Sequence, residues 1–129
     1  LCWQIPKEAD TMEMELMLQR DHQNIPCKIS EPDNGTIRRV VMGVHGFGGS
    51  MDDAIQVAIA EEMELFYAAT IRFDFPAHGD SPLESEALTL QNCIDTLLYV
   101  AQWAHNRYPD LDFCIFFSSF CLVLRVKKS

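Results

Sequence analysis

A glycine-rich turn between two regular segments is the stretch of this sequence best suited to chemistry. The apolar run 40–44 is typical of a buried strand, and a helical pattern follows from Asp52. The turn between them contains His45-Gly46-Phe47-Gly48-Gly49. Glycines let backbone N–H groups approach a negative charge, and the N-terminus of the following helix adds partial positive charge. The stretch therefore predicts a cradle for an oxyanion or a phosphate.

The sequence weakens the phosphate alternative. A P-loop has the pattern G-x-x-x-x-G-K-[ST], which is absent, and no lysine accompanies the turn. Residues 45–49 also lack the G-x-G-x-x-G spacing of dinucleotide sites. No cluster of His, Asp and Glu has metal-ligand spacing. We therefore expect no cofactor and no metal, and we favour the oxyanion.

Composition and charge limit the classes of partner. The chain has 129 residues, 48 % of them hydrophobic, and a formal net charge of −9, which disfavours nucleic acid and anionic membranes. The five cysteines have no C-x-x-C spacing, as in reduced thiols of a cytosolic protein, and we expect those within apolar patterns to be buried. No apolar run is long enough to span a bilayer. Because the sequence begins with Leu1 rather than Met, an export signal upstream of it is kept as an alternative. The cysteines are Cys2, Cys27, Cys93, Cys114 and Cys121.

The periodicity predicts one α/β domain with an antiparallel β-hairpin followed by a parallel βαβαβ unit. Alternating side chains mark the first hairpin strand, and Pro26 suggests that the second strand begins at an edge. Ser50 is expected to cap the first helix, with Asp53 completing a capping box. Thr89 is expected to cap a second helix that ends at Pro109. The predicted strands are 11–19, 25–29, 40–44, 67–73 and 113–117, with a polar turn at 20–24.

Each predicted helix has an apolar stripe that should face the sheet, and right-handed crossovers should place the helices on both faces. Three glutamates of the first helix are expected to face water. The stripe of the first helix is Ile55, Ala58, Ile59 and Met63, its glutamates are Glu61, Glu62 and Glu64, and the stripe of the second helix is Leu90, Ile94, Leu97, Leu98, Ala101 and Ala104.

Three motifs together resemble the α/β hydrolases. Residues 45–49 resemble the oxyanion loop after the third strand of that family, and residues 72–81 (RFDFPAHGDS) resemble its loop after the fourth strand. The second loop is most similar to the cinnamoyl/feruloyl esterases and the serine aminopeptidase-like group. Ser118-Ser119-Phe120 falls where the nucleophile elbow belongs. The resemblance covers about residues 11–120, and it implies the N-terminal part of a three-layer α/β-hydrolase domain.

The resemblance implies a role for each residue of these motifs. Ser119 would be the nucleophile, and the backbone N–H groups of Phe47 and Phe120 would form the oxyanion hole. A general-base role for Asp74 and an unusual pairing of Ser119 with a histidine of this chain are minor alternatives. The histidines are His22, His45, His78 and His105, and the residues implied to shape the loops are His45, Gly46, Gly48, Gly49, Asp74, His78 and Gly79.

The sequence departs from the family at the elbow. Phe117 and Cys121 occupy the two glycine positions of G-x-S-x-G, and residues 121–129 resemble an apolar strand with a basic end rather than the elbow helix. Our hypothesis is that the reading frame changes after Phe120. The family places the triad acid and histidine after the nucleophile, which here means beyond residue 129. We therefore expect a truncated serine hydrolase of small-molecule carboxylic esters; the alternatives are a peptidase or amidase of the same fold and an inactive fragment.

Overall fold

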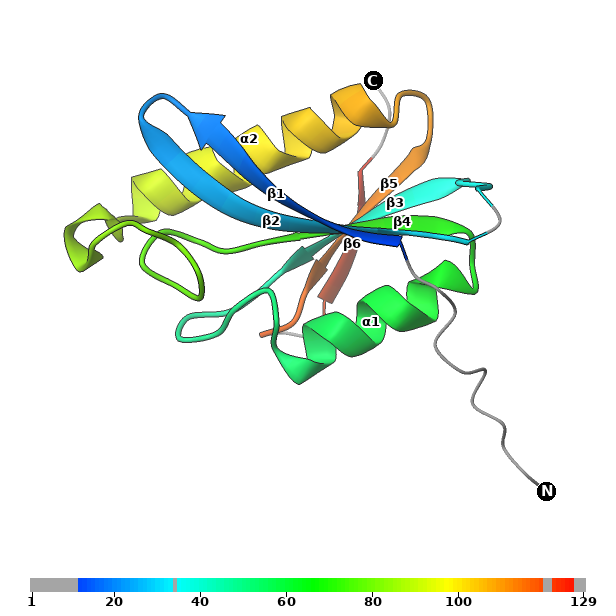
Figure 1. Ribbon diagram of the computed structural model, residues 1–129, viewed down its shortest axis with the longest axis horizontal. Coiled ribbons are helices and arrows are strands. Elements are labelled where there is room, and N and C mark those ends of the chain that lie inside the picture. The colour runs from blue at the N-terminus through cyan, green and yellow to red at the C-terminus, as the bar shows by residue number, and fades with distance from the viewer. Residues whose placement is uncertain (1–11, 34, 120–121, 127–129) are drawn as a thin grey trace.

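The computed structural model describes residues 12–33, 35–119 and 122–126. Strands β1 (Met12–Arg20) and β2 (Gln23–Glu31) form the antiparallel hairpin that the alternation predicts (Figure 1). The turn is shorter than expected, because only Asp21 and His22 lie outside the strands, and Asp21 has a positive φ of 53°. The hairpin is therefore confirmed, with a longer second strand than the sequence indicates.

Strand β2 lies inside the sheet rather than at its edge. It pairs with β1 on one side and, over Cys27–Ser30, with β4 (Ala68–Phe73) on the other. Pro26 lies just outside this second ladder, where a missing N–H is tolerated. Its carbonyl accepts a hydrogen bond from the Asp74 N–H at 3.1 Å. The prediction that this strand begins at an edge was therefore wrong. It was right only in that Pro26 takes no part in the ladder with β4.

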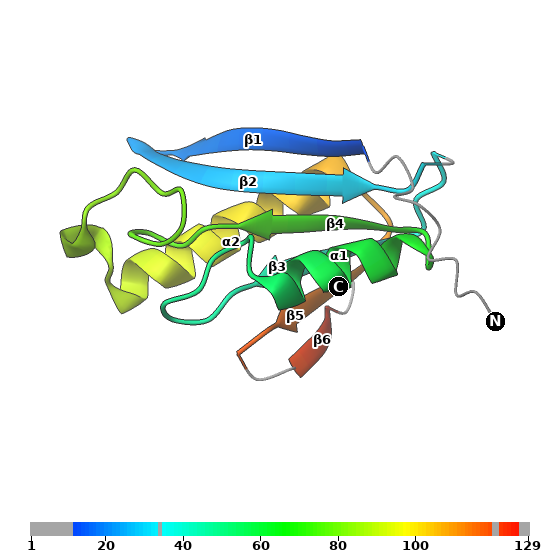
Figure 2. The ribbon, with the colours of Figure 1, turned by 60° about the horizontal axis from the view of Figure 1, so that its bottom comes forward.

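The centre of the sheet is parallel. Strand β3 (Arg39–Val44) pairs in parallel with β4 on one side and with β5 (Asp112–Phe117) on the other. The order across the sheet is β1-β2-β4-β3-β5-β6. Residues 40–44 are all buried, as expected for a central strand with helices on both faces (Figure 2). The predicted α/β class and the parallel βαβαβ unit are confirmed.

Helix α1 (Ala54–Glu64) starts later and faces the sheet differently than predicted. Its N-cap is Asp53 instead of Ser50, although the Asp53 carboxylate still accepts the Ser50 N–H at 3.0 Å. The buried residues of α1 are Gln56 and Ala60, whereas Ile55 and Ala58 are exposed and Ile59, Met63 and Glu64 are half-buried.

The reason for this rotation lies on β3. A Cβ at Gly43 would lie 2.2 Å from the Gln56 Oε1, so the glycine leaves room for a buried glutamine that the apolar pattern cannot reveal. The half-buried carboxyl of Glu64 also differs from the expectation that it faces water. Its burial, with Asp33, Glu61 and Glu13 nearby, raises the pKa of Glu64 to about 7.

Helix α2 (Leu90–Arg107) begins at the predicted cap. The Thr89 hydroxyl accepts the Asn92 N–H at 3.1 Å, and a short 3₁₀ turn (Ser85–Ala87) precedes it. Only part of the predicted stripe faces the sheet, because the buried residues are Thr96, Val100 and Ala104. Three residues of the predicted stripe are exposed instead: Leu90, Ile94 and Leu98.

Residues 122–126 form an edge strand. Strand β6 (Leu122–Val126) pairs antiparallel with β5, and all five of its residues are exposed. Between α2 and the β5–β6 hairpin lies a hollow of about 540 Å³, lined by Leu98, Phe113 and Val126 among others. The strand-like character expected after Phe120 is therefore seen over 122–126.

The cysteines of the described residues differ in how far they are buried. Cys27 is buried, Cys93 and Cys114 are only half-buried, and all three are free thiols; Cys2 and Cys121 lie outside the described residues. The burial expected of Cys93 and Cys114, the two cysteines within apolar patterns, is therefore only partial. Over the described ranges, neither helix has the length and apolar character needed to cross a membrane.

Candidate active site

The carboxyl ends of β3 and β5 bring two of the predicted motifs together. The Ser118 N–H donates to the Val44 carbonyl at 3.1 Å, which aligns the two strand ends. Ser119 follows as an exposed turn residue. A Cβ at Gly46 would lie 2.7 Å from the Ser119 Cβ and 3.4 Å from its Oγ. The glycine turn therefore packs directly against Ser119, and only glycine fits at this point.

The turn itself has the geometry that its glycines permit. The Gly49 N–H donates to the Gly46 carbonyl at 3.0 Å, and Gly48 has a φ of +78°, as at the third position of a type II turn. Phe47 lies at the tip with 91 % of its surface exposed, so its side chain does not plug the core. Within the described ranges no group accepts the Phe47 N–H. That donor is free to bind a ligand.

His45 is buried and both of its ring nitrogens are engaged. Its Nε2 accepts the Phe75 N–H at 3.1 Å, so its Nδ1 carries the hydrogen and donates to the Gly46 carbonyl at 2.8 Å. Burial lowers the pKa of His45, because the charged ring would be poorly solvated. His45 therefore has no nitrogen left to take a proton from Ser119.

His78 links the loop after β4 to the glycine turn. Its Nε2 accepts the Gly48 N–H at 2.9 Å, and its Nδ1 donates to the Pro76 carbonyl at 3.0 Å. The ring centroid of His78 lies 5.1 Å from that of His45 and 5.6 Å from that of Phe47, which meets it edge-on. Both nitrogens of this second histidine are thus also occupied.

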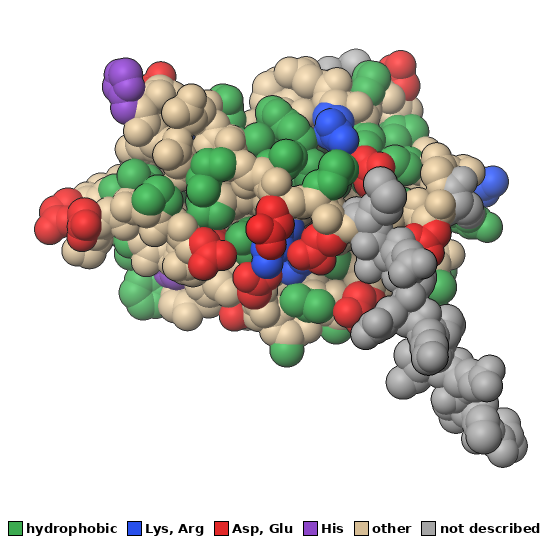
Figure 3. Space-filling model, viewed as in Figure 1, with side chains coloured by type: hydrophobic (Ala, Val, Ile, Leu, Met, Phe, Trp, Pro, Cys, Tyr) green, Lys and Arg blue, Asp and Glu red, His purple; other side chains and the backbone are tan. Residues whose placement is uncertain are grey.

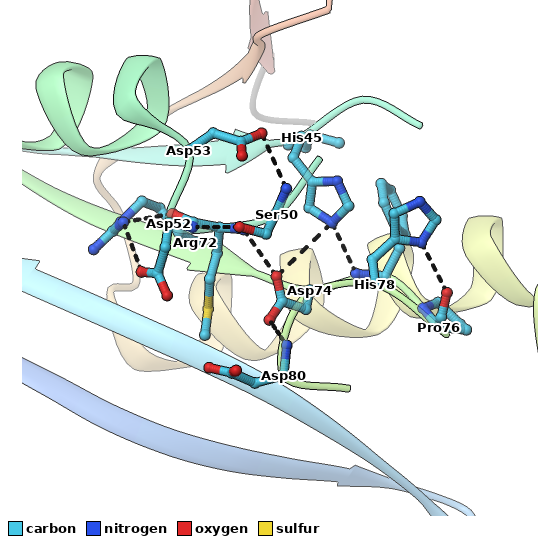
Figure 4. A network of polar contacts seen from close by, with 12 residues as sticks. His45, Ser50, Asp52, Asp53, Arg72, Asp74, Pro76, His78 and Asp80 are labelled. Carbon is cyan, nitrogen blue, oxygen red and sulfur yellow. Dashed lines mark hydrogen bonds and ion pairs between the residues drawn. The ribbon is translucent and has the colours of Figure 1, made fainter. Parts of the chain in front are cut away.

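Asp74 is the polar centre of the loop after β4 (Figure 4). Its side chain is buried, and its two oxygens accept the N–H groups of Met51 and Asp80, each at 2.8 Å. Gly79, at a φ of +51°, passes so close that a Cβ would lie 2.4 Å from the carboxylate. The Asp74 carboxylate therefore holds the backbone of two loops together, and no contact within the described ranges joins it to Ser119.

Arg72 is a structural residue of this site that the sequence did not single out. It is buried, and its guanidinium donates to the Met51 carbonyl at 2.5 Å. Acidic side chains lie within 4 Å of Arg72 and Lys28, among them Glu13 and Asp52. Figure 3 shows acidic and basic side chains gathered near the middle of one face. Asp52 joins both cations, at 3.7 Å from Arg72 and 2.7 Å from Lys28. A charged residue inside the apolar strand 68–73 is the signal that could have found it.

Two of the four histidines lie away from this site, and one predicted oxyanion donor is not described. Phe120 lies outside the described residues. His22 is exposed in the β1–β2 turn and His105 is exposed on α2. Because His45 and His78 are occupied as well, no histidine in the described part of the chain is available as a base for Ser119.

Comparison with known proteins gives the fold. No protein-family model matches the sequence, and no curated protein matches it. Three similar solved structures are Est1E from Butyrivibrio proteoclasticus with ferulic acid bound (TM-score 0.71, 24 % identity), an α/β serine hydrolase without a lid from Xanthomonas campestris (0.68, 18 %) and an esterase from Pyrococcus furiosus (0.68, 20 %). The matches cover 79 %, 81 % and 87 % of this chain and 41 %, 50 % and 44 % of those proteins.

The sheet order, the loop contacts and these similarities together define the class. The chain has the α/β-hydrolase fold and covers part of it. It spans half or less of the length of the three solved proteins.

Proposed function

We propose that this chain carries the nucleophile and the oxyanion loop of a serine hydrolase of carboxylic esters. Ser119 is the nucleophile, and the N–H groups of Phe47 and Phe120 bind the oxyanion of the tetrahedral intermediate. The main support is the contact between the two loops, since Gly46 leaves room for Ser119 where a Cβ would lie 2.7 Å from the serine Cβ. The free N–H of Phe47 in the same turn supplies a donor.

Carboxylic esters are the substrates that we favour, because the oxygen leaving group of an activated ester departs more easily than an amine, which must be protonated as it leaves. The name of the esterase similar to this chain, and the ferulic acid bound to Est1E, also favour a small carboxylic ester. A peptidase or amidase of the same fold is the second candidate.

By itself the chain is expected to be a slow catalyst or an inactive one, because no histidine within the described ranges is available to Ser119 as a base. Exogenous imidazole can supply that base if the nucleophile and the oxyanion donors are in place. The experiment is to treat the purified chain with a fluorophosphonate at several imidazole concentrations and to locate the adduct by peptide mass spectrometry. Ser119→Ala removes the proposed nucleophile, and Ser118→Ala is the matched control.

The expected result is an adduct on Ser119 that grows with imidazole, is lost in Ser119→Ala and is kept in Ser118→Ala. No adduct at any imidazole concentration, or equal labelling of other serines, would overturn the assignment of Ser119. Labelling and ester turnover without imidazole would instead refute the expectation that the isolated chain lacks a base.

A further inference from the structure

The glycine turn is held by hydrogen bonds from a different strand end. The Gly48 N–H points to the Nε2 of His78, which lies 30 residues later in the chain. His78 is itself fixed, because its Nδ1 donates to the Pro76 carbonyl and little of its surface is exposed. The acceptor of Gly48 is therefore part of a rigid loop rather than a mobile surface side chain.

This hydrogen bond sets the orientation of the peptide that joins Phe47 to Gly48. In a type II turn the central peptide is free to flip toward the type I orientation when nothing holds its N–H. The positive φ of Gly48, +78°, shows that the type II orientation is the one adopted. A flip would change the ψ of Phe47 and the φ of Gly48, and it would turn the Gly48 N–H away from His78.

His45 holds the other end of the same turn. Its Nδ1–H donates to the Gly46 carbonyl, which also accepts the Gly49 N–H. One imidazole therefore fixes the first residue of the turn, and the other fixes the third. The two rings contact each other at a centroid distance of 5.1 Å, so the two supports form a single unit.

We propose that His78 is a positioning residue that holds the Gly46–Gly49 turn, which carries the proposed oxyanion donor Phe47 N–H, in its type II conformation beside Ser119. This proposal rests on the proposed function, in which the turn binds an oxyanion. The hydrogen bond from the Gly48 N–H to His78 can be measured without any activity. Toward Gly48 the imidazole acts only as an acceptor, so a neutral side chain with an oxygen near the position of Nε2 should replace it in this contact.

The first test uses the unmodified chain. In a uniformly ¹⁵N-labelled sample, an N–H···N hydrogen bond gives a scalar coupling between the Gly48 nitrogen and the His78 Nε2, which a through-hydrogen-bond NMR experiment detects. Nδ1 should carry the proton at neutral pH. Absence of the coupling, with both resonances assigned, would overturn the proposal without any substitution.

The second test uses variants and reads hydrogen exchange at single amides. His78→Leu should speed exchange of the Gly48 amide roughly tenfold, while His78→Gln should restore much of the protection, because its amide oxygen can accept the same N–H. The Met51 and Asp80 amides, bound to Asp74, report whether the rest of the site is folded. The exposed His105→Leu is the matched control. Equal exchange in the Leu and Gln variants would contradict the proposal.

A third measurement connects the turn to Ser119. The imidazole-dependent fluorophosphonate labelling should slow roughly tenfold in His78→Leu and recover in His78→Gln. Labelling that is lost in the wild type as well would refute the proposed function while the NMR results still decide the role of His78. Normal labelling in His78→Leu would show that the turn does not need this support.

Discussion

Two regions of the same sheet differ in how completely their side chains are buried. They are the pair of loops after β3 and β4, and the β5–β6 hairpin. The loops bury His45, Asp74 and His78 and give each of them two hydrogen-bond partners on the backbone. The hairpin leaves four apolar residues of β6 between 45 and 59 % exposed: Leu122, Val123, Leu124 and Val126. One region is complete within this chain, and the other presents a surface that apolar burial would stabilise.

The contrast shows which parts of the fold are encoded locally. The side chains of His45, Asp74 and His78 find their hydrogen-bond partners within residues 45–80. The apolar face of β6 and the exposed side of α2 flank the same 540 Å³ hollow, which no described element fills. We therefore expect the loops after β3 and β4, the site loops, to be better ordered in this chain alone than the β5–β6 hairpin is.

The largest expected effect comes from the centre of the site loops. Asp74→Ala leaves the buried N–H of Met51 and the partly buried N–H of Asp80 without acceptors, and it should lower the free energy of unfolding by about 3 kcal/mol. Urea unfolding followed by circular dichroism measures this loss. Asp80→Ala is the control, since its side chain is exposed and only its backbone takes part. A loss below about 1 kcal/mol would mean that the loops do not depend on buried polar contacts.

A somewhat smaller effect is expected where the turn touches Ser119. Gly46→Ala forces a Cβ to within 2.7 Å of the Ser119 Cβ, so the two loops must separate, at a cost of about 2 kcal/mol. Gly48→Ala is the matched variant, because its Cβ would meet nothing within 4 Å and only its φ of +78° is strained.

The two variants should differ in labelling more than in stability. Gly46→Ala is expected to abolish imidazole-dependent labelling of Ser119, whereas Gly48→Ala should reduce it only in part, since the alanine keeps the N–H that His78 accepts. Equal labelling of both variants would show that the close approach of Gly46 and Ser119 is unimportant.

The sequence predicted the parts of this structure that follow from local pattern. The alternation in 11–19, the apolar strands and the Thr89 cap all gave correct elements, because each depends on residues close in the chain. The faces of the helices could not be predicted as well. Gln56 is buried because Gly43, on another element, makes room for it, and Leu98 is exposed because nothing described covers that side of α2.

In the candidate site, too, local motifs could be predicted and contacts between distant residues could not. The glycines of the turn and Ser119 could be identified as a motif, but the hydrogen bonds of His78 and the role of Arg72 depend on contacts between strand ends. Those contacts join residues 20 to 30 positions apart, for example Arg72 to Met51 and His78 to Gly48. No local pattern reports them.

Substitutions on the exposed β5–β6 hairpin should change self-association more than they change the free energy of unfolding. Leu124 is 46 % exposed, so Leu124→Lys should change the free energy of unfolding by less than about 0.5 kcal/mol. The added charge should nevertheless reduce self-association, which light scattering measures over a range of concentrations. Met17→Lys, at an exposed site on the opposite edge strand, is the control. A wild-type chain that is already monomeric would contradict the view that the hairpin is the incomplete region.

The smallest effect concerns pH and separates the site loops from the rest. The pKa of His45 is lowered in the folded chain, so below about pH 6.5 the unfolded state binds a proton that the folded state does not. The stability that neutral His45 contributes is therefore present above that pH and is lost as the pH falls. Glu64 acts in the opposite sense, because a pKa raised to about 7 stabilises the folded state at low pH and destabilises it as the pH rises.

Separating the two groups gives a direct measurement. In Glu64→Gln the free energy of unfolding should be higher than in the wild type at pH 8, and it should fall as the pH is lowered from 7.5 to 5.5. Glu62→Gln, an exposed neighbour on α1, is the control for the substitution. After correction for intrinsic exchange, protection of the Phe75 amide, whose acceptor is the His45 Nε2, should fall over the same range while that of hairpin amides does not. Equal loss in both regions would mean that acid acts on the whole fold and that the site loops are not a separate unit.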